Sequence, residues 1–269
     1  MKTEQAKELI DQQLESLGSA LEAGRSDTLQ TFLSAMARFH KYSLGNVLLI
    51  MAQSQDATHV AGFQTWRSFG RFVKAGEKGI AILAPMLFKG NREETPDRRS
   101  HEGEDSEERF LRFRVVYVFD VAQTDGEPLP EFAKVSGDPG DYAERLKGLT
   151  RQLSIELEYS DQLGGAFGIS KGGSIVLQEG LDPALEFTTL VHELAHEILH
   201  HGEGREGTTK RSRELQAEAV AYVVAQAIGL DAGTASSDYI QLYHGDKDLL
   251  SESLDAVRKA SGIILDGIS

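Results

Sequence analysis

The segment Thr189-Leu-Val-His-Glu-Leu-Ala-His-Glu-Ile-Leu-His-His201 decides how the second half of the chain folds. Its apolar residues recur at helical spacing, which predicts a buried helix over residues 183–201. His192 and His196 are four residues apart, so their side chains would lie on one face of that helix, one turn apart. Two imidazoles at that spacing can share one metal ion, and Glu193 lies beside them. Polar side chains in an apolar helix need such partners.

The spacing His-Glu-x-x-His is the signature of zinc hydrolases, in which the glutamate faces a metal-bound water. We therefore assign His192 and His196 as metal ligands and Glu193 as the catalytic residue. The alternative is a chance match, because the motif fixes only three positions. The histidines would then be hydrogen-bonded within the fold and bind no metal. His200 would lie about 12 Å along the helix axis from His192, too far to join the same coordination sphere.

The third ligand must be histidine, a carboxylate or water, because the chain contains no cysteine. The next predicted helix, over residues 210–229, carries Glu214 and Glu218 four residues apart. We expect Glu214 to be the third ligand. Glu218 lies in an apolar run, and we expect it to accept a hydrogen bond from a ligand histidine. The alternative is the reverse assignment, with Glu218 as the ligand and Glu214 as the acceptor. A further alternative is that both carboxylates form ordinary surface pairs and bind no metal.

One Zn²⁺ held by two histidines and a glutamate keeps a fourth position for water, which is the catalytic pattern. Glu193 would take a proton from that water and pass it to the leaving amine. An oxyanion donor is also required. The candidates are Tyr239, Tyr243, His244 and His201, and the sequence does not choose among them. The hairpin predicted over 166–177 would either align an extended peptide or serve only the fold.

The remaining pattern predicts an α+β chain of two domains, because Pro and Gly cluster at 124–130 and 137–140. We place an N-terminal domain with helices and a small antiparallel sheet at 1–133, and a C-terminal zincin-like metallopeptidase domain at 134–269. Expected helices span 3–23, 26–39, 43–54, 64–72, 142–153, 183–201, 210–229, 235–244 and 248–260. Expected strands span 80–88, 110–119 and 154–159, with a charged loop over 90–108 joining the first two.

The charge is uneven along the chain. The whole sequence has 28 basic and 42 acidic residues, a net charge of −14, which opposes nonspecific binding of nucleic acid by the whole surface. Residues 25–89 nevertheless carry eight lysines and arginines against three acidic residues, interleaved with aromatic side chains. This composition suits a single-stranded nucleic acid, whose backbone follows charge and whose bases stack on rings. An ordinary basic face over an aromatic core is the alternative.

No apolar run approaches the roughly 18 residues that a membrane-spanning helix needs, and the N-terminus lacks the apolar stretch of a signal peptide. We therefore expect a cytoplasmic protein with no membrane partner.

Two family resemblances emerge from these residues. His192 and His196 followed by Glu-x-x-Ala-Glu at 214–218 resemble the gluzincin peptidases, and the compact layout resembles the ImmA/IrrE group of intracellular metallopeptidases. The stretches 42–50, 60–66 and 73–82 resemble the N-terminal single-stranded-DNA-binding domain of the ArdC antirestriction proteins. The ArdC family often has Trp soon after the second motif histidine, whereas this chain has Glu197 and Ile198.

The ArdC resemblance implies a protein of mobile elements that shields incoming DNA from host restriction. It also implies DNA contacts at Asn46, Trp66, Lys74 and Lys78. The basic, aromatic window adds five candidate DNA-binding residues, which are Lys41, Tyr42, Phe63, Arg67 and Arg71.

Three hypotheses for function follow. The first is a single-stranded-DNA-binding protein with a zinc-dependent metallopeptidase-like domain, acting in antirestriction. The alternative is a regulatory metallopeptidase of the ImmA/IrrE kind that cleaves a repressor or partner protein, with an N-terminal domain that binds protein. The third is non-enzymatic, and the metal then only stabilises the second domain.

Overall fold

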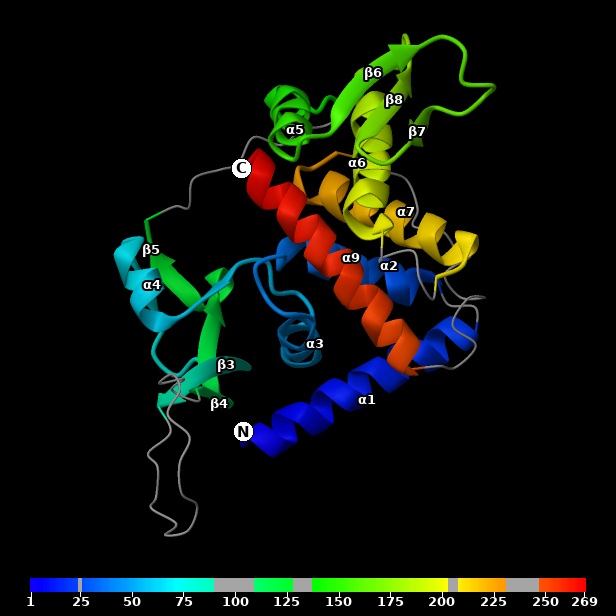
Figure 1. Cartoon of the computed structure of the whole chain (residues 1–269). Coiled ribbons are helices and arrows are strands. Elements are labelled where there is room, and N and C mark those ends of the chain that lie inside the picture. The colour runs from blue at the N-terminus through cyan, green and yellow to red at the C-terminus, as the bar shows by residue number, and fades with distance from the viewer. Residues whose placement is uncertain (24–25, 90–108, 128–136, 203–207, 231–246) are drawn as a thin grey trace, which may run out of the picture.

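The computed structural model describes residues 1–23, 26–89, 109–127, 137–202, 208–230 and 247–269 (Figure 1). Its mixed helical and sheet architecture confirms the α+β prediction. Three helices open the chain, namely α1 (Thr3–Glu22), α2 (Ser26–Arg38) and α3 (Leu44–Gln53). Ser43 caps α3, because its hydroxyl accepts a hydrogen bond from the Asn46 amide at 3.4 Å. Among the described residues, no helix is long and apolar enough to cross a membrane.

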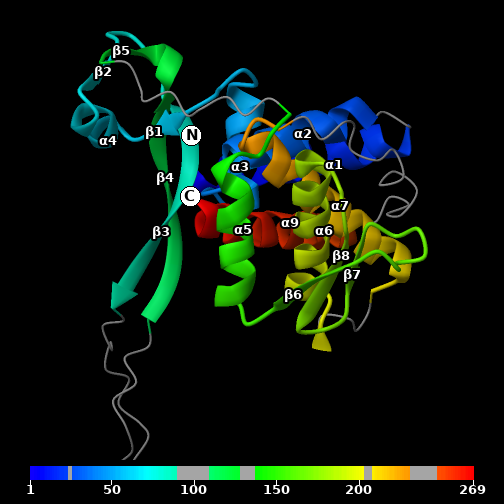
Figure 2. The same ribbon diagram turned by 90° about the horizontal axis from the view of Figure 1, so that it is seen from above.

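Two small sheets follow the opening helices. Their elements are β1 (Val60–Ala61), α4 (Phe63–Ser68), β2 (Arg71–Val73), β3 (Ile80–Lys89), β4 (Arg109–Asp120), η1 (Val121–Gln123) and β5 (Thr124–Gly126). The expected antiparallel pair is present as β3 and β4, in a sheet of order β1-β4-β3, and β2 pairs with β5. The helix expected over 64–72 ends earlier, because Gly70 has a φ of 70° and the chain then enters β2. The far end of the paired strands β3 and β4 projects away from the helices (Figure 2).

Two carboxamides of α3 bind the outer edge of β3. Asn46 donates to the carbonyl of Leu83 at 2.9 Å and accepts from its amide at 2.8 Å. Gln53, two helical turns later, makes the same pair of bonds with Ala81, at 2.9 and 3.0 Å. These side chains replace a neighbouring strand, so the helix closes a sheet edge that would otherwise expose unpaired backbone groups.

The second half begins with α5 and a three-stranded sheet and ends in three long helices. The elements are α5 (Asp141–Gln152), β6 (Glu156–Ser160), β7 (Gly168–Ser170), β8 (Ser174–Gln178), α6 (Pro183–Leu199), α7 (Lys210–Ala227) and α9 (Lys247–Ile268). The sheet order is β6-β8-β7, and β7 pairs antiparallel with β8, as the hairpin predicted over 166–177 requires. Helix α9 runs past residue 260, because Ile264, Leu265 and Ile268 are buried. The helix expected over 235–244 lies outside the described residues.

A continuous hydrophobic core joins both halves of the chain. Helix α2 packs on α7, and α9 packs on α1, α3, α5, α6 and α7. Figure 1 shows α9 lying between α1 and the pair α6 and α7. Ser34 of α2 and Tyr222 of α7 also share a hydrogen bond of 3.1 Å. The opening helices therefore share a core with the second half. The boundary expected between residues 133 and 134 lies outside the described residues.

Candidate metal centre

Helix α6 places the two motif histidines beside α7. The helix starts with Pro183 after Asp182, whose carboxylate caps the amide of Leu185 at 3.0 Å. Nine and thirteen residues after Pro183, His192 and His196 lie on one face, and their Nε2 atoms are 3.1 Å apart.

Glu214 of α7 completes a set of three possible ligands. Its Oε2 lies 3.6 Å from the Nε2 atoms of both His192 and His196. One ligand atom from each residue falls within 4.8 Å of the others, and among the described residues no other group of this kind occurs. Two nitrogens and one carboxylate oxygen converging on one point suit a divalent metal ion.

The histidines are held in the form that binds metal. Burial lowers the pKa of His192, and burial together with the neighbouring His192 lowers the pKa of His196 to about 4. Both rings are therefore neutral near pH 7, so each can offer a lone pair.

Glu193 lies on the same helix and is buried, with 8% of its surface exposed. Burial raises its pKa to about 7, against the effect of a backbone hydrogen bond from Ser170, and the nearby Glu214 and Glu197 carboxylates raise it further. A carboxyl group with a pKa near 7 both accepts and returns a proton at neutral pH. Its chemistry therefore fits the general base that the motif predicts.

Strand β7 passes directly over Glu193. A Cβ atom at Gly168 would lie 2.7 Å from Glu193 Cγ and 2.8 Å from Thr189 Cγ2. The strand approaches α6 this closely only because residue 168 has no side chain.

We expect Gly168→Ala to lower the free energy of unfolding by about 1–3 kcal/mol, because the added methyl group overpacks β7 against α6. Chemical denaturation measures this loss. Gly148→Ala is the matched control, because a Cβ there meets only Arg151 Nη2, at 3.9 Å, and helix α5 should gain about 0.5–1 kcal/mol. Equal changes in the two variants would show that β7 does not lie against Glu193.

A buried carboxylate at Glu197 holds the β7–β8 turn on α6. It accepts hydrogen bonds from Ser170 Oγ at 2.6 Å and from the amides of Gly172 and Gly173 at 3.0 and 2.8 Å. His201 Nε2 lies 3.3 Å from it. Burial alone would raise the pKa of Glu197, but the bonds from Ser170, Gly173 and Gly172 hold it below its ordinary value. Sequence reasoning noted this residue only as a departure from the ArdC pattern.

Glu218 is exposed, although its apolar neighbours in the sequence suggested a buried carboxylate, and its expected hydrogen bond to a ligand histidine stays a prediction. His200, which the sequence argument excluded as a ligand but did not place, contacts Nδ1 of His196 through its own Nδ1 at 2.9 Å. Tyr239, Tyr243 and His244 lie outside the described residues.

Several residues that were expected to bind DNA are instead buried or hydrogen-bonded within the fold. Trp66 is 2% exposed and donates its indole N–H to the carbonyl of Phe119 at 2.8 Å. Asn46 is buried against β3, and the Tyr42 hydroxyl donates to Val60 at 3.0 Å. In this conformation a base cannot stack on Trp66 or contact Asn46, so both expectations are corrected.

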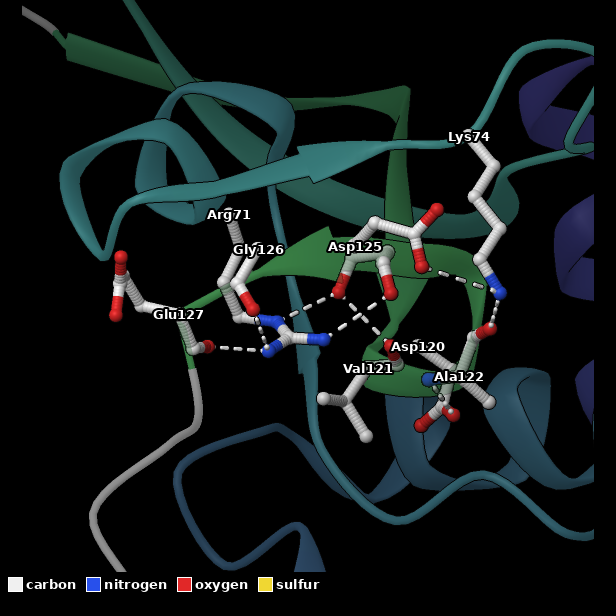
Figure 3. Close-up of polar contacts among 9 residues, drawn as sticks. Arg71, Lys74, Asp120, Val121, Ala122, Asp125, Gly126 and Glu127 are labelled. Atoms are coloured by element: carbon white, nitrogen blue, oxygen red, sulfur yellow. Dashed lines mark hydrogen bonds and ion pairs between the residues drawn. The ribbon is translucent and has the colours of Figure 1, made fainter.

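Arg71 of β2 binds β5 and the residue that follows it, and Lys74, just after β2, binds η1 and β5 (Figure 3). The Arg71 guanidinium donates to Thr124 and to the carbonyls of Gly126 and Glu127. Lys74 donates to the carbonyl of Ala122 at 2.9 Å and lies 3.8 Å from Asp125. Arg71 therefore serves the fold, whereas Lys74 keeps 41% of its side chain exposed. Four other candidates have exposed side chains, namely Lys41, Phe63, Arg67 and Lys78.

Comparison with known proteins matches both halves of the chain. Residues 3–119 match the family described as the N-terminal domain of anti-restriction factor ArdC, and residues 143–231 match the IrrE N-terminal-like domain of the peptidase M78 family. An uncharacterized protein of Bacillus anthracis is 24% identical over 273 residues, covering 88% of this chain. The chain spans 46% of that relative's length.

Two solved structures share the fold. The metal-free antirestriction protein ArdC from plasmid R388 aligns with a TM-score of 0.56 and 17% identity, over 97% of both chains. Its Mn(II)-bound form aligns with a TM-score of 0.54 and 16% identity, over 97% of this chain and 98% of the other. The chain therefore shares the overall fold of a solved protein, as the ArdC resemblance predicted.

Proposed function

We infer that this chain, an ArdC-like protein that joins an ArdC-type N-terminal domain to an M78 peptidase-like domain, binds single-stranded DNA in an antirestriction role. The observation that carries this proposal is a group of exposed phenylalanines within the part of the chain that matches ArdC. Phe63, Phe69 and Phe72 are 47%, 56% and 58% exposed. Large apolar side chains gathered on one short surface segment mark a binding site.

The α4–β2 segment, residues 63–73, has the two properties that single-stranded DNA needs. Its exposed rings offer faces on which bases stack, each worth about 1–3 kcal/mol. Phe69 rests edge-on against the buried Trp66, with ring centroids 6.3 Å apart, so its ring has a rigid support. Arg67 in this segment and Lys78, five residues after it in the sequence, are exposed and offer positive charge for the phosphates.

We expect Phe69→Ala together with Phe72→Ala to weaken binding of a fluorescent oligothymidylate by at least about 10-fold, because two stacking faces are lost. Fluorescence anisotropy across a salt series measures this loss, and the salt slope should stay unchanged because no cation is removed.

Phe167→Ala is the control for this double variant, because Phe167 is 53% exposed but lies in the second half of the chain. Unchanged affinity of the double variant, or an equal loss with Phe167→Ala, would contradict the proposed interface.

We further propose that His192, His196 and Glu214 hold one divalent ion, and that this ion is zinc. Support comes from the convergence of their ligand atoms within 4.8 Å and from the neutral state of the histidines. A bound zinc ion would supply an acidified water and a Lewis acid. Glu193 would accept the proton of that water and return it to the leaving amine. Tyr239, Tyr243 and His244 remain the proposed oxyanion donors.

The second candidate function is a regulatory metallopeptidase that cleaves a repressor or partner protein. The observation that favours it is the proximity of β7 to Glu193, since β7 is an edge strand of its sheet. An edge strand can pair with an extended peptide and align it along the site. In that case the N-terminal domain would recognise protein, and the DNA measurement above separates the two functions.

A further inference from the structure

A row of hydrogen-bonded, buried polar side chains runs from Nδ1 of His196 to α9. His196 Nδ1 lies 2.9 Å from His200 Nδ1, and His200 Nε2 lies 2.9 Å from Gln216 Oε1. Gln216 Nε2 then donates to Ser253 Oγ at 3.0 Å. His200, Gln216 and Ser253 are 5%, 9% and 3% exposed, and they come from the C-cap of α6, from α7 and from α9 respectively. Polar groups buried this deeply need a reason beyond packing.

The direction of each hydrogen bond follows from the chemistry of the groups. The Gln216 amide nitrogen points to Ser253, so its carbonyl oxygen faces His200. A carbonyl oxygen only accepts, so His200 Nε2 carries a proton. The hydrogen-bond partners of His200 are an imidazole and a carboxamide, and neither compensates a positive charge in a buried site. His200 is therefore neutral, and its Nδ1 is an acceptor.

The protonation of His196 is then determined. Since His200 Nδ1 accepts, His196 Nδ1 must donate, which leaves the lone pair of a neutral His196 on Nε2. Nε2 is the atom that faces His192 and Glu214, at 3.1 and 3.6 Å. The row thus selects the tautomer of His196 that can bind an ion at the centre of the candidate site.

We infer that His200 and Gln216 are positioning residues for the metal, acting through His196, with Ser253 fixing the Gln216 amide. This inference rests on the proposed metal centre. Partners that orient a ligand histidine typically change metal affinity by about 10–100-fold. Ser253 lies on α9, which also packs on α1 and α3. The first half of the chain therefore supports the geometry of the metal centre.

The test compares Gln216→Met with Gln216→Glu in the full chain. Competition of Zn²⁺ against a chromophoric chelator should give an affinity about 10–100-fold lower for Gln216→Met, which has no acceptor. Gln216→Glu keeps an acceptor at the same place and should stay within a few-fold of the unaltered protein. Equal losses in the two variants, or no loss in Gln216→Met, would overturn the inference.

A measurement on the unaltered protein guards against variants that do not fold. The ¹⁵N chemical shifts of the histidine rings in metal-free protein should place the His196 proton on Nδ1, and a proton on Nε2 would overturn the inference. Failure of the metal centre itself is distinguishable, because the unaltered protein would then not compete with the chelator for Zn²⁺ at all.

Discussion

Glu193→Gln is expected to lower kcat/KM for peptide hydrolysis by about 10²–10⁴-fold while leaving the metal bound. Glutamine has nearly the same shape as glutamate but accepts no proton. The unaltered carboxyl is suited to this step, because burial raises its pKa to about 7. His192, His196 and Glu214 are untouched, so metal content should not change. A quenched fluorescent peptide library measures hydrolysis, and atomic emission measures the metal.

Glu158→Gln is the matched control for this variant, because it makes the same chemical change at an exposed position on β6. It should leave hydrolysis and metal content unaltered. Hydrolysis that survives in Glu193→Gln would show that another group moves the proton. The same variant tests the role of catalysis in the cell. Full protection of incoming DNA by Glu193→Gln would mean that binding, and not cleavage, does the work.

The parts of the site that the sequence predicted depend on local geometry. His192 and His196 are four residues apart, and any helix over that segment brings them to one face. Glu214 followed from a similar argument, because its helix was recognisable and the chain has no cysteine to compete as a ligand. The cap of α3 by Ser43 is equally local, since a cap needs only the next three residues.

The parts that the sequence did not predict depend on distant segments. Glu197 finds its partners in the β7–β8 turn, and Gln216 finds Ser253 on a different helix. Neither contact produces a periodic pattern in the sequence from which it could be predicted. The burial of Glu218 was inferred from its apolar neighbours, but neighbours in a helix face different sides of it. A charge in an apolar run is therefore weaker evidence of burial on a helix than on a strand covered on both faces.

Trp66→Ala is expected to lower the free energy of unfolding by about 3–5 kcal/mol, the usual cost of removing a large buried aromatic side chain. Trp66 is 2% exposed, and its N–H bond to Phe119 joins α4 to β4. The single Trp of the chain was expected to stack on DNA, and the sequence could not exclude this, because an indole suits a core and a stacking surface equally well. Denaturant unfolding followed by circular dichroism measures the loss.

Phe63→Ala separates the two roles of an aromatic ring in this segment. Phe63 is 47% exposed, so its removal should change stability by less than about 1 kcal/mol while weakening DNA binding. Trp66→Ala should lower stability but change DNA binding little, when binding is measured below the unfolding transition. The buried tryptophan would affect binding only through its support of Phe69. A Trp66→Ala protein as stable as the unaltered chain, with DNA binding abolished, would mean that the indole leaves the core to meet the bases. The burial described here would then be one state of an interface that rearranges on binding.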